Sequence, residues 1–270
     1  MAAPLRIRVI TALVLAFGMF AIVLWLPPVM TVIVLTVGVL AGAWEWSAFL
    51  RLTSKPLRVL YVALVAALLV PVWRYTADPA GRELVLSVAL AWWIIALGWI
   101  VFAPRRVTSW SAALAGVFAL VPAWLSLMRL RLDQPNGAQW MLFVLILVWV
   151  ADIGAYFFGG RYGRLHLAPA VSPGKTWEGV LGGVILATVI AVCGSLWFRI
   201  PPVLFVPLCL AGVAFSIVGD LTESLLKRFA GIKDSGSVFP GHGGVMDRID
   251  SVTGAAPVLL FGLTAFGVVA

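Results

Sequence analysis

The sequence predicts an all-α polytopic membrane protein with about nine transmembrane helices. Of its 270 residues, 63% are hydrophobic and only 11% are charged, and the mean hydropathy is +1.08. Soluble domains are about 45–50% apolar and about 25% charged, so a soluble fold could not bury this much apolar surface. The apolar residues also fall into runs close to the ~20 residues that cross a bilayer.

Nine apolar segments are candidate spans, and all should be helices because open backbone cannot face lipid. They lie near residues 9–26, 29–50, 57–73, 84–103, 107–128, 138–158, 179–198, 202–219 and 252–270. The third is the weakest, because few uncharged residues separate Arg58 from Arg74 and Pro71 interrupts them. The first partly resembles a signal peptide but lacks a small-residue cleavage site, so we interpret it as a retained helix.

The distribution of positive charge predicts an N-in, C-out orientation. With the N-terminus in the cytosol, the inner segments hold fourteen Lys and Arg residues and the outer segments hold five. This bias agrees with the positive-inside rule. The basic residues are scattered between apolar segments, which indicates topological anchors and argues against a nucleic-acid partner despite the net charge of +8. The two cysteines fall inside apolar segments and suggest neither disulfides nor a metal site.

The acidic residues divide the chain into two regions. Residues 1–137 form an N-terminal transmembrane region of about five helices, and residues 138–270 form a C-terminal region that we expect to be catalytic. Seven of the eleven carboxylates lie between residues 152 and 250, at predicted inner helix ends or in inner loops. Ionisable groups at membrane depth are costly and usually functional. We therefore expect the active site at the cytosolic face.

The first chemistry-bearing segment, A-D-I-G-A-Y-F-F-G-G-R-Y-G, covers residues 151–163. Asp152 lies near the inner end of the sixth span and precedes a glycine-rich turn. Two interpretations stay open. Asp152 either pairs with Arg161 or Arg164 at the helix end, or faces a bound nucleotide or metal.

The second segment, S-P-G-K-T-W-E-G, covers residues 172–179. Its Gly-Lys-Thr resembles the end of a P-loop, but that motif needs a further glycine at position 169, which is proline. What remains is a flexible Gly/Pro turn with a cation and a hydroxyl at a helix start, where anions bind favourably. Lys175 is a candidate phosphate contact, and the alternative is a lysine that snorkels to the surface.

The third segment, residues 219–251, carries the strongest signal. Asp220 is expected to end one span, and Glu223 follows on the same helix face, four residues before Lys227. Cations and glycines follow, which predicts a loop from 231 to 244.

Two further carboxylates, Asp247 and Asp250, share a face in the first turn of the last helix. Mg²⁺ takes oxygen ligands, usually one or two carboxylates and substrate phosphates. Two acidic helix ends around a cation-rich loop therefore predict a metal and phosphate site. An ordinary charged loop, with acidic residues that stabilise a helix N-terminus, is the alternative.

Residues 224–250, S-L-L-K-R-F-A-G-I-K-D-S-G-S-V-F-P-G-H-G-G-V-M-D-R-I-D, resemble the signature of the phosphatidate cytidylyltransferases, also called CDP-diacylglycerol synthases. Every fixed position of that signature is present. Segments 151–163 and 172–179 resemble the family as well. The resemblance implies that CTP and phosphatidate react to give CDP-diacylglycerol and pyrophosphate, in a reaction that depends on Mg²⁺. One or two such metal ions could neutralise the nucleophile and the leaving group.

The resemblance also implies individual roles. The implied metal-site carboxylates are Asp220, Asp247 and Asp250, and Lys227 joins them among the catalytic residues. The implied substrate and phosphate contacts are Asp152, Lys175, Arg228, Lys233, His242 and Arg248, where His242 and its neighbouring glycines line the nucleotide loop.

Other expectations concern partners and competing functions. We expect membrane lipid as a partner, a bacterial inner membrane as the location, and a homodimer from close-packing glycines. A relative acting on a different lipid phosphate is the nearest alternative. A CDP-alcohol phosphotransferase is disfavoured because its Asp-Gly-x-x-Ala-Arg motif is absent. A transporter is disfavoured because the charges cluster at one face and no repeat is visible.

Overall fold

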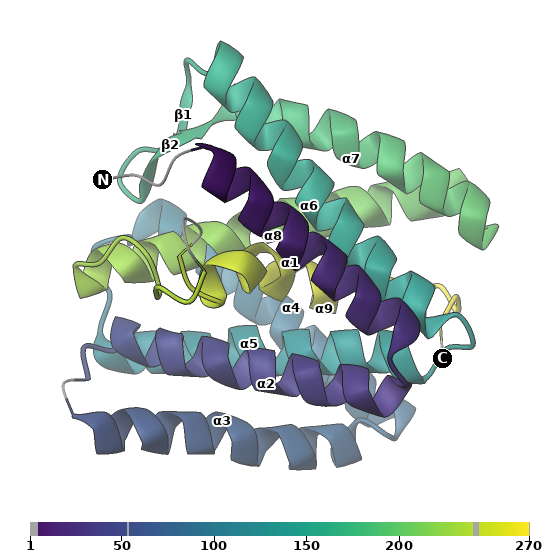
Figure 1. Ribbon diagram of the computed structural model, residues 1–270, viewed down its shortest axis with the longest axis horizontal. Helices are drawn as coiled ribbons and strands as arrows, with labels where there is room; N and C mark the ends of the chain where they lie inside the picture. Colours follow the sequence, from purple (N-terminus) through teal and green to yellow (C-terminus); the bar gives the residue numbers. More distant parts are fainter. Residues whose placement is uncertain (1–4, 53, 240–242, 270) are drawn as a thin grey trace.

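The computed structural model, which describes residues 5–52, 54–239 and 243–269, is a bundle of helices (Figure 1). The helices of these residues are α1 (Leu5–Trp25), α2 (Pro28–Phe49), α3 (Lys55–Tyr75), α4 (Pro79–Phe102), α5 (Ser109–Leu132), α6 (Gly137–Tyr162), α7 (Trp177–Phe198), α8 (Pro202–Ala230) and α9 (Met246–Ala265). The predicted all-α polytopic fold is confirmed. One short antiparallel hairpin, β1 (His166–Ala168) and β2 (Ser172–Thr176), replaces the flexible turn expected between α6 and α7.

Seven of the described helices, α2 to α8, are long and apolar enough to cross a membrane. The third span, expected to be the weakest, is a continuous helix of 21 residues that contains Pro71. In α1, the apolar part found in the described residues is the shorter segment Leu13–Trp25. The chain is therefore a multi-pass membrane protein, and its two end helices are the least typical spans.

Helix α9 is atypical because it lies in the interior of the bundle. It begins with charged residues and packs against α2, α4, α5, α6 and α8. Every residue from Asp250 to Leu260 is buried. A helix surrounded by protein does not need a lipid-facing apolar surface, which explains why its composition is less apolar than that of its neighbours.

Helices α6 and α7 approach each other closely through glycines. A Cβ atom added at Gly183 would lie 2.8 Å from the backbone oxygen of Ala151, and one at Gly179 would lie 2.9 Å from that of Ala155. Gly179 and Gly183 therefore allow the two helix backbones to approach closely. At Gly38, by contrast, an added Cβ would meet nothing within 4 Å, so this glycine makes no such contact.

Helix α8 extends beyond the apolar span that Asp220 was expected to end. It continues without a break to Ala230, just before the loop predicted from residue 231. Gly231, at φ 74°, then ends the helix in the left-handed conformation that favours glycine. The Arg51 guanidinium, beyond the end of α2, donates to the Phe229 carbonyl and lies 4.0 Å from the centre of the Phe229 ring. The end of α8 is therefore held against α2.

The chemistry-bearing segments gather at one end of the bundle. Figure 1 shows the hairpin, the start of α1 and the connection from α8 to α9 at the left, and the end of α9 at the right. The start of α1 and the end of α9 thus lie at opposite ends, as an odd number of spans requires. The N-in, C-out orientation itself stays a prediction.

Candidate active site

A cavity of about 1220 Å³ opens at this end of the bundle, between α6, α7, α8, β2 and the start of α9. Its described wall carries carboxylates and cations in nearly equal number. The carboxylates are Asp152, Asp220, Asp234, Asp247 and Asp250, and the cations are Lys175, Lys227, Lys233 and Arg248. Charged groups predicted from three separate segments of the sequence therefore line one cavity.

Asp220 and Lys175 form an ion pair on one wall of the cavity. The Lys175 ammonium, on β2, lies 2.5 Å from Asp220 Oδ2, and both side chains keep about a quarter of their surface exposed. Ser224 donates to Asp220 Oδ1 over 3.3 Å. Asp152 of α6 lies close enough to interact electrostatically with both members of the pair and with Asp250. Of the two interpretations of Asp152, the geometry favours the one in which it faces the site.

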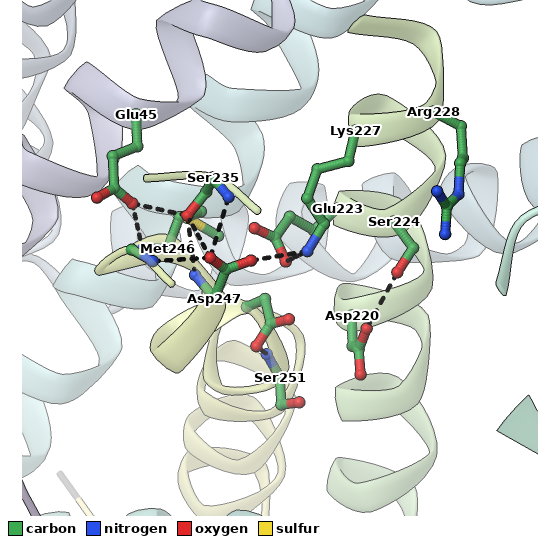
Figure 2. Close-up of polar contacts among 12 residues, drawn as sticks. Glu45, Asp220, Glu223, Ser224, Lys227, Arg228, Ser235, Met246, Asp247 and Ser251 are labelled. Atoms are coloured by element: carbon green, nitrogen blue, oxygen red, sulfur yellow. Dashed lines mark hydrogen bonds and ion pairs between the residues drawn. The ribbon is translucent and has the colours of Figure 1, made fainter. Parts of the chain in front are cut away.

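Lys227, seven residues after Asp220 on α8, links two carboxylates. Its Nζ atom lies 3.0 Å from Glu223 Oε2 and 2.8 Å from Asp247 Oδ1 (Figure 2). The first contact is the i, i+4 pair that the sequence predicted. The second joins α8 to the first turn of α9, across the signature loop. One ammonium therefore fixes two helix segments that are twenty residues apart in the chain.

The second oxygen of Asp247 organises the signature loop. Asp247 Oδ2 accepts hydrogen bonds from the backbone N–H groups of Ser235, at 3.0 Å, and Gly244, at 2.8 Å, and from the Ser235 hydroxyl at 2.9 Å. Burial alone would raise the pKa of Asp247, but the hydrogen bonds from Lys227 and Gly244 outweigh it and hold that pKa below its usual range. Asp247 is thus an ionised group with both oxygens engaged.

Glu223 and Asp250 are two enclosed carboxyl groups next to the cavity. The Glu223 side chain has no exposed surface and lies within hydrogen-bonding reach of Asp250. Asp250 is 9% exposed and accepts a hydrogen bond from the Ser251 N–H over 2.8 Å. Asp250 also interacts electrostatically with Asp220. Carboxyl groups held this close are not all ionised at once unless a cation accompanies them.

The hairpin is fastened to the start of α7 by two side chains. The Glu178 carboxylate accepts the N–H groups of Arg164 and Leu165 over 3.1–3.3 Å. The Thr176 hydroxyl accepts the Gly179 N–H over 3.2 Å and caps α7, as expected for a hydroxyl at a helix start. These contacts hold β2, and therefore Lys175, over the cavity.

The other predicted phosphate contacts are not all in one place. Lys233 and Arg248 line the cavity. Arg228 is not among its described lining, and its Nε atom donates to the Val171 carbonyl over 3.4 Å. His242 lies outside the described residues. The geometry thus unites most of the predicted basic residues with the carboxylates and places Arg228 beside the hairpin turn.

The sequence analysis missed Glu45, near the end of the apolar helix α2. Glu45 of α2 is 6% exposed and accepts hydrogen bonds from Val245, Met246 and Ser235. A signal was available, because a lone carboxylate inside a span is by default a functional candidate. Glu45 lies far in the sequence from the acidic cluster between residues 152 and 250. Ser235 was not singled out either.

The carboxylates of the cavity are a suitable donor set for a hard divalent cation. Asp220, Asp250 and Asp152 offer oxygen atoms on the described wall. No three His, Cys, Asp or Glu side chains among the described residues are arranged to hold a metal by themselves.

Comparison with known proteins identifies the family. The model of the cytidylyltransferase family matches residues 6–266. The chain is 39% identical to the phosphatidate cytidylyltransferase of Haemophilus influenzae, over 94% of this chain and 96% of the relative. It is 41% identical to that of Pseudomonas aeruginosa, over 97% and 98%. Matches of this length leave little of the chain outside the resemblance, and the chain belongs to the cytidylyltransferase family.

Proposed function

We propose that this membrane enzyme transfers CMP from CTP to phosphatidate, giving CDP-diacylglycerol and pyrophosphate. The observation that carries the proposal is the cavity wall, where five carboxylates and four cations meet at one end of a membrane bundle. Paired charges of this kind suit a reaction between two phosphate compounds. The same reaction is named for the relatives from Haemophilus influenzae and Pseudomonas aeruginosa.

The nucleophile is an oxygen of the phosphatidate phosphate. A phosphate monoester has a second pKa near 6, so this oxygen is largely deprotonated at pH 7 and needs no general base. It attacks the α-phosphorus of CTP and forms a new P–O bond. The bond from the α-phosphorus to the bridging oxygen breaks, and pyrophosphate leaves with both electrons of that bond. Catalysis of such a transfer is mostly positioning and electrostatic stabilisation.

The residues of the cavity have different roles in positioning the substrates and stabilising charge. Lys175, Lys233 and Arg248 are placed to contact the phosphates, while Asp220 and Asp250 would hold a divalent cation, which we take to be Mg²⁺. The cation would neutralise charge on the attacking and leaving oxygens. Asp247 was expected to be a third metal ligand. Because both its oxygens are engaged, we assign it instead to holding the loop and Lys227 in place.

The location of the site follows from the same proposal. We place the cavity at the cytosolic face, where CTP is available, with the acyl chains of phosphatidate remaining in the bilayer while the headgroup enters. The membrane would be the inner membrane of a bacterium, in line with the bacterial relatives. We also keep the predicted homodimer as part of this proposal.

The test is turnover by the purified chain in detergent micelles. We expect CDP-lipid and pyrophosphate only when CTP, phosphatidate and Mg²⁺ are all present, with loss on chelation and recovery on adding Mg²⁺. Asp220→Asn and Asp250→Asn should lower kcat by about 100-fold or more, beyond the 10–100-fold typical of outer-shell changes. Glu83→Gln, at an exposed carboxylate of α4, is the matched control and should leave turnover unchanged.

Other outcomes would redirect the proposal. Turnover with a prenyl phosphate but not with phosphatidate would point to a different lipid phosphate as the substrate. Flux of CTP or lipid across liposomes without chemical turnover would favour a transporter. Full activity of Asp220→Asn would remove the assigned cation site.

A further inference from the structure

We propose that Glu45 of α2 is a positioning residue for the transfer reaction. Its carboxylate fixes both ends of the signature loop, at Ser235 and at the start of α9, and so sets the position of Asp247 and Lys227. This inference rests on the proposed function for its catalytic consequence. The anchoring itself can be measured separately.

The contacts of Glu45 are short and reach both ends of the loop. Oε1 accepts the N–H of Val245 at 3.0 Å, and Oε2 accepts the N–H of Met246 at 2.8 Å. Oε2 also accepts the Ser235 hydroxyl at 2.8 Å, as Figure 2 shows. The partners are about 190 to 200 residues away in the chain. A residue of the N-terminal region therefore holds the loop on which the site is built.

The start of α9 depends on this carboxylate. The first N–H groups of a helix have no partner inside the helix. The N-cap residue of α9, Val245, offers no side-chain cap. Glu45 supplies the missing acceptors from another helix, and a negative charge at a helix N-terminus is favourable. Without Glu45, one buried and one partly buried N–H group at the start of α9 would lose their acceptor.

Two glycines of the loop leave room for Glu45. A Cβ atom added at Gly236 would collide with Glu45 Oε1, and one added at Gly244 would collide with both oxygens of that carboxylate. The glycine content of the loop is therefore matched to a side chain of α2. This steric fit is independent of the hydrogen bonds and leads to the same residue.

Ser235 connects Glu45 to Asp247 through its hydroxyl group. Its hydroxyl lies 2.8 Å from Glu45 Oε2 and 2.9 Å from Asp247 Oδ2, and a hydroxyl donates its one proton to one of these oxygens at a time. Asp247 in turn binds Lys227. Glu45 itself is not among the described residues that line the cavity. It acts through Ser235 and Asp247, without touching the substrate.

The experiment compares Glu45→Gln with Thr36→Val. Glutamine keeps the size of the side chain but replaces one acceptor oxygen by an NH₂ group, which cannot accept an N–H. Thr36→Val is a matched control on the same helix, because it removes the hydrogen bond from Trp124 Nε1 to Thr36 at 2.9 Å, away from the loop. Both variants are first checked for folding by thermal unfolding in detergent.

Two readouts decide the proposal. Hydrogen–deuterium exchange should become faster in residues 235–247 of Glu45→Gln and stay unchanged there in Thr36→Val. The kcat for CDP-lipid formation should fall about tenfold or more in Glu45→Gln, as for other outer-shell residues, with the KM for phosphatidate within about twofold. In the double variant with Ser235→Ala, kcat should fall no further than in the worse single variant, because both residues act in one relay.

Either of two results would overturn the inference. One is a folded Glu45→Gln variant whose kcat is within about twofold of that of Thr36→Val. The other is hydrogen–deuterium exchange in residues 235–247 that Glu45→Gln does not change. If Glu45→Gln does not fold, Ser235→Ala alone decides, and an unimpaired kcat in that variant would be the contrary result. Absence of turnover by the unmodified chain would instead refute the proposed function, so the two failures are distinct.

Discussion

Replacing Lys227 with methionine removes the cation that lies between two enclosed carboxylates. Glu223 would lose the 3.0 Å partner of its Oε2 atom, and Asp250, itself a carboxyl group, cannot replace the lost cation. Asp247 would keep three donors, from Ser235 and Gly244. The main cost therefore falls on Glu223, whose side chain has no exposed surface.

The size of the effect follows from this geometry. Removing one partner of a buried pair typically costs about 3–5 kcal/mol, because the remaining charge is uncompensated. At roughly 2–4 °C per kcal/mol for a chain of this size, the unfolding temperature should fall by about 6–20 °C. The unfolding can be followed in detergent by the fluorescence of the 13 tryptophans.

A second variant separates the charge from the loss of packing. In Lys227→Met with Glu223→Gln, the uncompensated carboxylate is gone, so we expect at least half of the lost stability to return. CDP-lipid formation should not return, because the double variant still lacks the cation in the cavity. The reasoning would be refuted if Lys227→Met unfolded within about 2 °C of the unmodified chain, or if the double variant were no more stable than the single one.

Two further predictions concern the loop and the helix pair. The pKa of Asp247 is held below its usual range, so its stabilising contribution should be present above about pH 4 and lost as the pH falls through the lowered pKa. The stability of Asp247→Asn should therefore depend less on pH below about pH 4 than that of the unmodified chain. Equal acid profiles for the two proteins would contradict this. Gly183→Leu should destabilise the chain by about 1–3 kcal/mol or more and lower CDP-lipid formation, because its Cβ would press on the Ala151 backbone beside Asp152. Gly38→Leu, with open space at its Cβ, is the control, and similar losses in both would refute the steric argument.

The architecture was largely predictable because the bilayer imposes it. Each apolar run near 20 residues became a helix, and even the segment interrupted by Pro71 is continuous. The hydropathy pattern could not show where α8 ends. Its polar continuation from Asp220 to Ala230 is stabilised by contacts with α9 and with Arg51, which are far apart in the sequence.

The sequence predicted which charged residues belong to the site, but it did not predict most of the ion pairs that they form. A surplus of carboxylates and lysines in an apolar chain pointed to Asp220, Asp247 and Lys175, because charge at membrane depth needs a reason. The sequence paired Lys227 with Glu223 from helical spacing, and that pair is present. The pairing of Lys175 with Asp220 depends on how β2 lies over α8, which no local spacing encodes.

The sequence by itself determined that this protein is a multi-pass membrane enzyme of the cytidylyltransferase type, because its composition excludes a soluble fold and its signature segment is contiguous. Only the tertiary structure decided how that segment is held. Glu45 stands alone in an apolar helix, and its importance comes from contacts about 200 residues away. Hydrogen bonds between distant segments depend on packing in three dimensions, so the anchor of the loop appears only when α2 is placed against α9.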